Sequence, residues 1–149
     1  MQAPPTRRAF VYDTTAVVAA ALALRLDFAH ALRVDGDQAV YPVPSQDGAT
    51  VDRDHAVILV RYDNAVYAFV LWCPHQHTPL RWHDADRQFE CPKHHSTFRP
   101  DGAFIEGRAT RAMDRYALRR DGATIIVELG TVYQQDADQA AWNAAAVKL

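Results

Sequence analysis

"CPHQHTPLRWHDADRQFECPKHHSTF", residues 73–98, contains both cysteines of the chain and five of its seven histidines. Cys73 and His75 are separated by one residue, Cys91 and His94 by two, and fifteen residues lie between His75 and Cys91. Each end of the stretch therefore offers one sulfur and one nitrogen. By number alone, two cysteines fit a disulfide, a metal site or two separate core thiols. The neighbouring histidines favour a metal site, because thiolate and imidazole are both common metal ligands.

Length and composition limit the possible classes of protein. The chain has 149 residues, of which 49% are hydrophobic, enough for one domain with a buried core and short extensions. Lys and Arg total 16 against 18 Asp and Glu, a formal charge of -2 with no long run of either sign. A nucleic-acid-binding role is therefore set aside, because it would need a basic patch or stripe.

The region from about residue 40 to residue 129 is predicted to be all β. Short apolar runs alternate with turn residues such as Asp63-Asn64 and Asp121-Gly122. The cysteine and histidine stretch lies between two predicted hairpins, so its ligands are expected on two loops held by a rigid sheet. The strands expected to pair are 55–62 with 65–72, and 115–120 with 123–129.

The N-terminal segment, residues 1–31, is similar to an export signal. Thr6-Arg7-Arg8-Ala9-Phe10-Val11 places two arginines before an apolar stretch, as in the twin-arginine signal. The apolar segment is shorter and more polar than the roughly 20 residues of a comfortable membrane span. Cleavage near Ala29-His30-Ala31, retention as an anchor helix, and an ordinary amphipathic helix all stay open. The expected location is the periplasm, soluble or anchored to the inner membrane by an uncleaved signal.

Residues 131–149 are predicted to form a short helical tail. Asp136 can cap a helix, Gln139 sits at the reciprocal capping position, and the many alanines favour helix. Trp142 and Val147 would give this helix a small apolar face, which is expected to pack on its own domain rather than on a partner.

The ligand spacing resembles that of the Rieske proteins, in which C-x-H is followed, after about fifteen to seventeen residues, by C-x-x-H. "CPKHHSTF" at 91–98 is similar to the family's C-P-x-H-G-S-x-F/Y, and "GAFIEGRATRAMDRY" at 102–116 resembles its third loop. The likeness spans roughly residues 40 to 130. It implies an all-β fold, an antiparallel β-sandwich at residues 32–130 with two ligand loops.

The resemblance also implies a 2Fe-2S cluster and one-electron transfer. Cys73 and Cys91 would bind one iron, and His75 and His94 the other, so that neutral imidazoles stabilise the added electron. The outer imidazole nitrogens would lie near the surface, where a redox partner can approach. We expect an electron-transfer subunit rather than a catalytic chain by itself. The remaining histidines of the stretch are expected at the surface or beside the ligands: His77, His83 and His95.

Several positions depart from the family pattern. The quinol-oxidising members carry a disulfide between positions that are Thr78 and Lys93 here, so that disulfide is not possible. Glycines common after the ligands are replaced by His77 and His95, a residue type that tolerates unusual backbone angles better than most. Arg108 stands in the third loop where a proline is frequent.

Two further positions bear on the reduction potential. By resemblance, Ser96 would donate a hydrogen bond to a cluster sulfide, whereas Phe98 lacks the hydroxyl that a tyrosine would direct at a cysteine sulfur. Hydrogen bonds to these sulfurs favour the reduced state. We therefore expect a potential within the Rieske range but below that of members with both donors and the disulfide.

Other sites and functions compete with this interpretation. Two Cys and two His also suit a structural zinc ion, although zinc fingers usually place the cysteines together and the histidines together. A nucleophilic Cys-His pair has less support, because neither cysteine has a separate activating context.

Among redox roles, the leading prediction is a subunit or partner of a periplasmic or membrane-associated oxidoreductase. Small Rieske subunits of molybdenum enzymes such as arsenite oxidase are similar in size, signal and domain content. The alternatives are the Rieske subunit of a cytochrome bc-type quinol-oxidising complex and the ferredoxin of a Rieske oxygenase. A catalytic oxygenase subunit is not expected, since 149 residues leave no room for a second domain with its own iron site.

Overall fold

The computed structural model describes residues 36–149, which fall within one compact unit, Val34–Leu149. The signal or anchor predicted for residues 1–31 lies outside the described residues. In the described part, no helix has the length and apolar character needed to cross a membrane. Every strand pairing is antiparallel, which confirms the predicted all-β antiparallel class.

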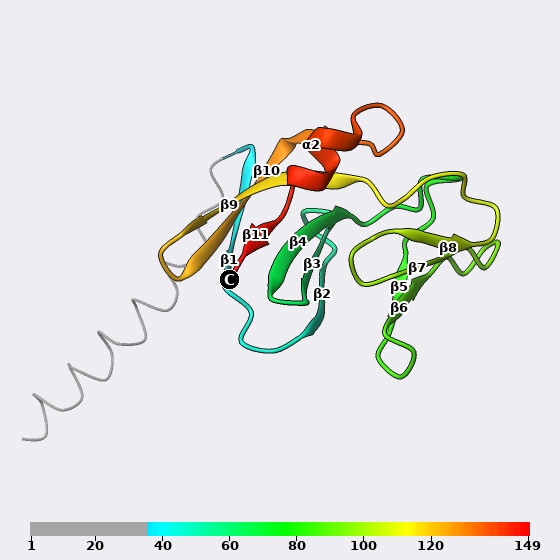
Figure 1. Ribbon diagram of the computed structural model, residues 1–149, viewed down its shortest axis with the longest axis horizontal. Coiled ribbons are helices and arrows are strands. Elements are labelled where there is room, and N and C mark those ends of the chain that lie inside the picture. Colours follow the sequence, from blue (N-terminus) through cyan, green and yellow to red (C-terminus); the bar gives the residue numbers. More distant parts are fainter. Residues whose placement is uncertain (1–35) are drawn as a thin grey trace, which may run out of the picture. The chain divides into compact units, whose positions relative to one another are not determined.

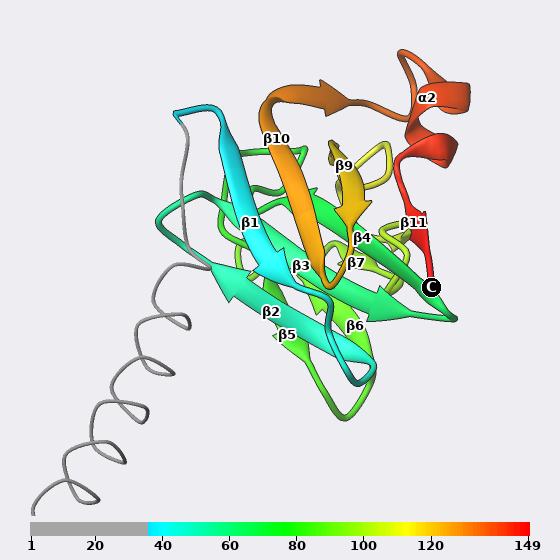
Figure 2. The ribbon, with the colours of Figure 1, turned by 90° about the vertical axis from the view of Figure 1, so that its left-hand side faces the viewer.

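The larger sheet has seven strands in the order β1-β10-β9-β4-β3-β2, with β11 paired to β4. In Figure 2, β1, β10 and β9 run at a steep angle to β2, β3 and β4, so the sheet curls over on itself. The predicted hairpins are present as β3 with β4 and as β9 with β10. The strands are β1 (Gln38–Pro42), β2 (Gly48–Asp52), β3 (Val57–Tyr62), β4 (Ala65–Val70), β9 (Arg115–Asp121), β10 (Thr124–Tyr133) and β11 (Val147–Lys148).

A second, four-stranded sheet has the order β5-β6-β7-β8. Figure 1 shows it at the opposite end of the described domain from the β9–β10 turn. The sequence predicted two ligand loops held by a single sheet, which was incomplete. The first loop, after β4, connects the larger sheet to the smaller one, and the second loop connects β6 and β7 within the smaller sheet. The strands are β5 (Arg81–His83), β6 (Gln88–Glu90), β7 (Thr97–Phe98) and β8 (Phe104–Glu106).

Strand β3 is covered on both faces, as its unbroken apolar run predicts. Val57 and Leu59 face one hydrophobic core inside the curled sheet, whereas Ile58 and Val60 face a second core. Successive side chains of a strand point to opposite faces, so an apolar run of this kind requires cover on both sides. The turn after β3 supplies Asp63 and Asn64 in the left-handed conformation typical of a two-residue hairpin turn.

The second core joins the two sheets and includes both cysteines. Phe69 of β4 meets Phe89 of β6 edge to face, with ring centroids 6.0 Å apart. Cys73 and Cys91 belong to the same buried cluster as these rings. Burying a phenylalanine side chain contributes about 1.5–3 kcal/mol, so this core holds both loops against the larger sheet.

The C-terminal segment combines a short helix with a strand. Helix α2 (Gln139–Ala144) is capped by Asp138, whose side chain accepts from the Ala141 N–H; the predicted cap at Asp136 was therefore wrong. The cap must immediately precede the first helical residue, and Asp138 occupies that place. Trp142 is buried and donates to the Met113 carbonyl oxygen at 2.8 Å, which confirms that the segment packs on its own domain.

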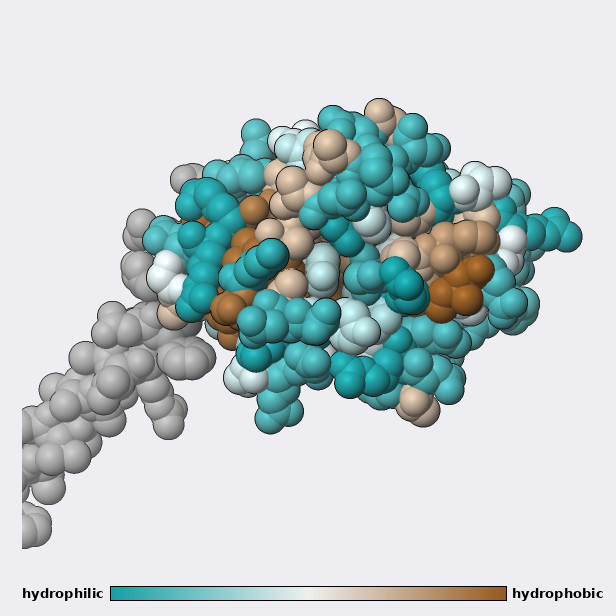
Figure 3. All heavy atoms as spheres, viewed as in Figure 1, coloured by the Kyte–Doolittle hydropathy of each residue, from teal (hydrophilic) through white to brown (hydrophobic). Residues whose placement is uncertain are grey.

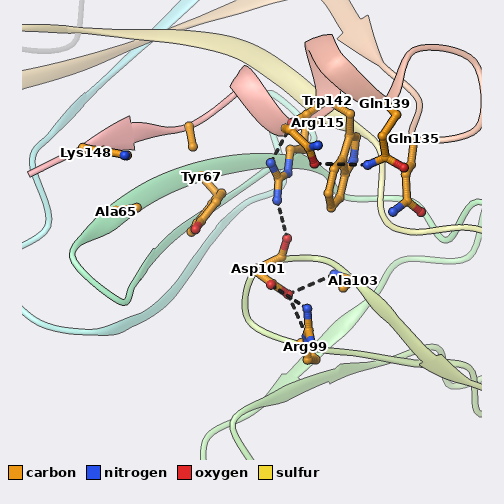
Figure 4. A pocket seen from close by; sticks show the side chains of 12 residues that line it. Ala65, Tyr67, Arg99, Asp101, Ala103, Arg115, Gln135, Gln139, Trp142 and Lys148 are labelled. Atoms are coloured by element: carbon orange, nitrogen blue, oxygen red, sulfur yellow. Dashed lines mark hydrogen bonds and ion pairs between the residues drawn. The ribbon is translucent and has the colours of Figure 1, made fainter.

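Arg115 on β9 connects three parts of the fold, as Figure 4 shows. Its guanidinium donates to the Trp142 carbonyl of α2 at 2.6 Å and to the Asp101 carbonyl, between β7 and β8, at 2.7 Å. The cation also lies 3.5 Å from the centroid of the Trp142 ring and 4.8 Å from that of Tyr67. Burial lowers its pKa to about 10. Carbonyl oxygens and aromatic faces thus stabilise a buried cation that ties the small sheet to the large one.

Candidate metal centre

The two ligand loops have the same backbone hydrogen-bonding pattern. In the first ligand loop, residues 73–80, the Cys73 carbonyl accepts from the fourth following N–H at 3.1 Å, and the Cys73 N–H donates to the fifth following carbonyl at 2.9 Å. In the second ligand loop, residues 91–98, the Cys91 carbonyl and N–H make the corresponding bonds, both at 2.9 Å. Each loop therefore folds back on its own cysteine.

His77 and His95 sit at the equivalent turning points of the two loops. Their φ angles are +44° and +54°, in the left-handed region that usually favours glycine. The histidines at these glycine positions thus adopt the unusual backbone angles that the family pattern implies. The left-handed conformation costs a non-glycine residue about 1–2 kcal/mol, which the closed backbone pattern of each loop offsets.

The two thiols form a buried pair. Cys73 and Cys91 are each 1% exposed, and neither forms a disulfide. Burial raises the pKa of the Cys73 thiol, and the adjacent Cys91 thiol raises it further. The backbone N–H groups of His75 and Gln76 act in the opposite direction, because they donate to the Cys73 sulfur. A sulfur that carries negative charge, as in a metal thiolate, would be stabilised by these donors.

The two imidazoles that the spacing predicts as ligands also lie together. The ring centroids of His75 and His94 are 5.0 Å apart, with the planes inclined at 63°. His94 Nδ1 is buried and has no hydrogen-bond partner within residues 36–149. Ring burial, followed by the charge of Arg108, holds the pKa of His94 below its usual value. A buried nitrogen without a partner costs about 1–3 kcal/mol, and a metal ion bound at its lone pair removes that cost.

Donors of the same chemical type therefore lie together, although they come from different loops. Each loop contributes one sulfur and one nitrogen, yet the fold places sulfur beside sulfur and imidazole beside imidazole. Two adjacent sites, one with two thiolates and one with two imidazoles, are the donor set of a Rieske 2Fe-2S cluster. In the region described by the structure, no group of three or more His, Cys, Asp or Glu side chains is arranged to hold a single metal ion.

Ser96 belongs to the second ligand loop and is held by the third loop, residues 102–116. It is fully buried, and its Oγ accepts hydrogen bonds from the backbone N–H groups of Arg108 and Ala109, both at 2.9 Å. A hydroxyl has two acceptor lone pairs and one hydrogen. Because both lone pairs are engaged, the Ser96 hydrogen is left to donate to another acceptor.

Gly107 permits this close approach of the third loop. Its φ is +112°, and a Cβ placed there would lie 2.4 Å from the Cα of Ser96. The sequence did not identify Gly107 as a site residue. Its signal was a glycine directly before Arg108 and Ala109 in the third loop.

Phe98, the second position expected to affect the reduction potential, lies in the core. It is fully buried, and its ring centroid is 5.9 Å from that of Phe104 on β8. Its role here is therefore packing between neighbouring strands of the small sheet.

The remaining histidines of the stretch differ in their contacts. His83 and His95 contact opposite oxygens of the Glu90 carboxylate, at 3.1 Å and 2.5 Å. The hydrogen bond from His95 lowers the pKa of Glu90. His77 is exposed. Glu90 was not predicted from the sequence, because its two partners are seven residues before it and five residues after it, a separation without a motif.

Comparisons with known proteins indicate a family that binds a 2Fe-2S cluster. A family model described as the Rieske [2Fe-2S] domain matches residues 28–117. The cytochrome b6-f complex iron-sulfur subunit of Chlorobaculum thiosulfatiphilum is 32% identical over 71 residues, which are 48% of this chain and 39% of that protein. The chain thus matches well under half the length of this relative.

Two solved structures are also similar. The plasma membrane Rieske protein of Synechocystis PCC 6803 has 27% identity and a TM-score of 0.47, over 54% of this chain and 83% of that one. The ferredoxin of carbazole 1,9a-dioxygenase from Nocardioides aromaticivorans IC177 has 25% identity and a TM-score of 0.41, over 58% and 88%. Because the family model matches more than half of the sequence, the chain belongs to the Rieske [2Fe-2S] domain family.

Proposed function

We propose that this chain transfers single electrons through a 2Fe-2S cluster held by Cys73 and Cys91 on one iron and His75 and His94 on the other. A Rieske domain binds such a cluster, and the cluster accepts and releases one electron. The observation that carries the assignment of the ligands is the pairing of like donors. Two buried thiols lie together, and beside them an imidazole pair includes a buried nitrogen that lacks a partner.

The surrounding residues serve this function in different ways. Backbone N–H groups of His75 and Gln76 stabilise negative charge on the Cys73 sulfur. The hydroxyl hydrogen of Ser96 is free to donate toward the cluster, since its lone pairs are engaged by the third loop. His75 is exposed, so an electron partner can reach the imidazole side without displacing other residues.

The ligand assignment is tested with four single variants of the full chain. His75→Ala and His94→Ala should each abolish the visible absorption and the electron paramagnetic resonance signal of the reduced cluster. His77→Ala and His95→Ala are the matched controls, and they should retain both signals with two irons and two sulfides per chain. Loss of the cluster in His77→Ala but not in His75→Ala would contradict the register, and a colourless protein with one zinc would support the structural zinc site.

The proposed setting is a periplasmic or membrane-associated oxidoreductase that this chain serves as an electron-transfer subunit. Thr6–Val11 supports export through the twin-arginine route, which suits cargo loaded with a cofactor. Small Rieske subunits of the arsenite oxidase type are similar in size, signal and domain content, and Thr78 and Lys93 in place of the disulfide cysteines count against a quinol-oxidising member. Substituting Arg7 and Arg8 together by lysine should leave cluster-loaded protein in the cytoplasm. Unchanged periplasmic or membrane location in cell fractions would contradict the signal.

A second candidate is the Rieske subunit of a cytochrome bc-type complex. The similarity to the iron-sulfur subunit of a cytochrome b6-f complex favours it. Purification from native membranes distinguishes the two: a cytochrome b partner would support the bc-type role, and a molybdenum-containing partner would support the first.

A further inference from the structure

The surface around the imidazole pair carries two permanent positive charges. Lys93 directly precedes His94, and the backbone of Arg108 lies against the second ligand loop through its hydrogen bond to Ser96. Both side chains are exposed. We call Lys93 and Arg108, which flank the imidazole pair, the cationic rim.

Neither Lys93 nor Arg108 makes an ion pair within residues 36–149. Half of the ten arginines in the described residues behave differently, because those at 61, 87, 99, 111 and 119 each contact a carboxylate. The acidic group nearest to the second ligand loop, Glu90, is occupied by two histidines. Glu106, two residues before Arg108, is exposed and does not pair with it. Lys93 and Arg108 thus present two positive charges without an ion pair in the described residues, on a chain whose formal charge is -2.

Apolar docking has less support than charged docking. The exposed large hydrophobic side chains of the described residues are dispersed, at Val51 on β2, Ile105 on β8 and Val132 on β10. The face seen in Figure 3 is predominantly hydrophilic, and its brown areas are separated by teal ones. Charge complementarity is therefore the property that can orient a partner at the imidazole side.

We propose that the cationic rim docks an acidic face of the redox partner protein. This inference rests on the proposed function, since the rim surrounds the imidazoles through which the electron would leave. Two cations that make no ion pair within residues 36–149, placed beside the transfer site, raise the encounter rate with a negatively charged protein and orient it. Binding to an anionic membrane is less well supported, because the rim has only two cations, whereas lipid-binding segments typically carry clusters of about 4–8.

The test uses the cluster-loaded full chain and two small oxidants of opposite charge, hexacyanoferrate(III) and tris(phenanthroline)cobalt(III). Stopped-flow oxidation of the reduced protein is measured between about 10 mM and about 300 mM ionic strength. The rate constant with the anionic oxidant should fall several-fold as salt rises, and that with the cationic oxidant should rise. Equal salt dependence for the two oxidants, or none, would overturn the proposal.

Variants locate the effect on the molecule. Lys93→Gln and Arg108→Gln should each lower the low-salt rate with the anionic oxidant about threefold, and the double variant more. Arg120→Gln removes the same charge at the far end of the β9–β10 hairpin and should change the rate little (Figure 1). The potential of each variant is measured as well, because a lost cation also changes the driving force. An equal effect of Arg120→Gln would overturn the proposal.

Two further outcomes separate the alternatives. Sedimentation with phosphatidylserine vesicles that is lost in the Lys93→Gln, Arg108→Gln double variant would overturn the protein partner in favour of a membrane surface. A chain that assembles no cluster would contradict the proposed function itself, and this failure is visible in the absorption spectrum before any rate is measured.

Discussion

The first and second ligand loops share one backbone design but differ in what packs against them. In each loop, the cysteine carbonyl accepts from the fourth following N–H, and the fourth residue is a left-handed histidine. The fifth residue is Thr78 in the first loop and Ser96 in the second. The Thr78 hydroxyl contacts only its own loop, at the Gln76 carbonyl, whereas Ser96 is fully buried and held by two N–H groups of the third loop.

Local sequence therefore sets the backbone shape of a ligand loop, whereas contacts from a distant segment set the direction in which its hydroxyl can donate. A hydroxyl at the solvent edge can be satisfied by water, so its hydrogen has many acceptors. A buried hydroxyl with both lone pairs engaged has one direction left. We therefore expect substitutions in the second loop to change the free energy of unfolding and the reduction potential more than equivalent substitutions in the first.

The largest effect is expected when the third loop is pushed away from Ser96. Gly107→Ala places a Cβ 2.4 Å from the Ser96 Cα, at a φ of +112° that alanine rarely adopts. We expect a loss of at least about 3 kcal/mol in the free energy of unfolding, with weakened cluster absorbance. Urea denaturation followed by circular dichroism measures the first, and the visible spectrum the second.

The matched control is Gly122→Ala. Gly122 also has positive φ, +56°, but nothing lies within 4 Å of its added Cβ. Backbone strain alone should then cost about 1–2 kcal/mol and leave the cluster spectrum unchanged. Equal losses in the two glycine variants would show that the contact between the third loop and Ser96 is unimportant.

The next effect concerns the reduction potential. Ser96→Ala removes a hydrogen-bond donor that we expect to stabilise the reduced cluster over the oxidised one by roughly 1.5 kcal/mol. The reduction potential should therefore fall by about 60 mV for one electron. Thr78→Val, at the equivalent position of the first loop, should shift the potential by less than about 15 mV. Protein-film voltammetry at one pH measures both. A shift in Thr78→Val as large as that in Ser96→Ala would remove the proposed difference between the loops.

A smaller redox effect is expected at Arg108. Arg108→Pro and Arg108→Gln both remove the guanidinium charge, but only proline also removes the N–H that donates to Ser96 Oγ at 2.9 Å. The potential of the proline variant should therefore lie about 20–30 mV below that of the glutamine variant. Identical potentials in the two variants would mean that the Ala109 N–H alone orients the serine.

The parts that the sequence predicted correctly depend on local patterns. The β3–β4 hairpin follows from apolar runs around Asp63-Asn64, and the cysteine and histidine spacing indicated the family that the comparisons established. Hairpin turns and ligand spacings are fixed by a few neighbouring residues, so a single sequence reveals them.

The parts that it missed depend on long-range contacts. The donors to Ser96 come from twelve and thirteen residues away, and the pairing of β11 with β4 joins residues 147 and 66. The prediction of a cap at Asp136 was wrong because Asp136 and Asp138 both precede the alanine-rich segment, and local sequence does not choose between them. No periodicity encodes contacts of this kind, because each depends on how distant segments pack.

The smallest expected effect tests the shared backbone directly. Alanine and glycine variants at His77 and His95 differ only in the cost of a left-handed backbone, so glycine should exceed alanine in the free energy of unfolding by about 1 kcal/mol in both loops. The histidine-to-alanine step should differ between the loops. His95→Ala loses the contact with Glu90, but this exposed pair is worth less than about 1 kcal/mol, and His77→Ala should cost still less. Chemical denaturation of the four variants gives these differences. A glycine advantage in one loop alone would contradict the common backbone design.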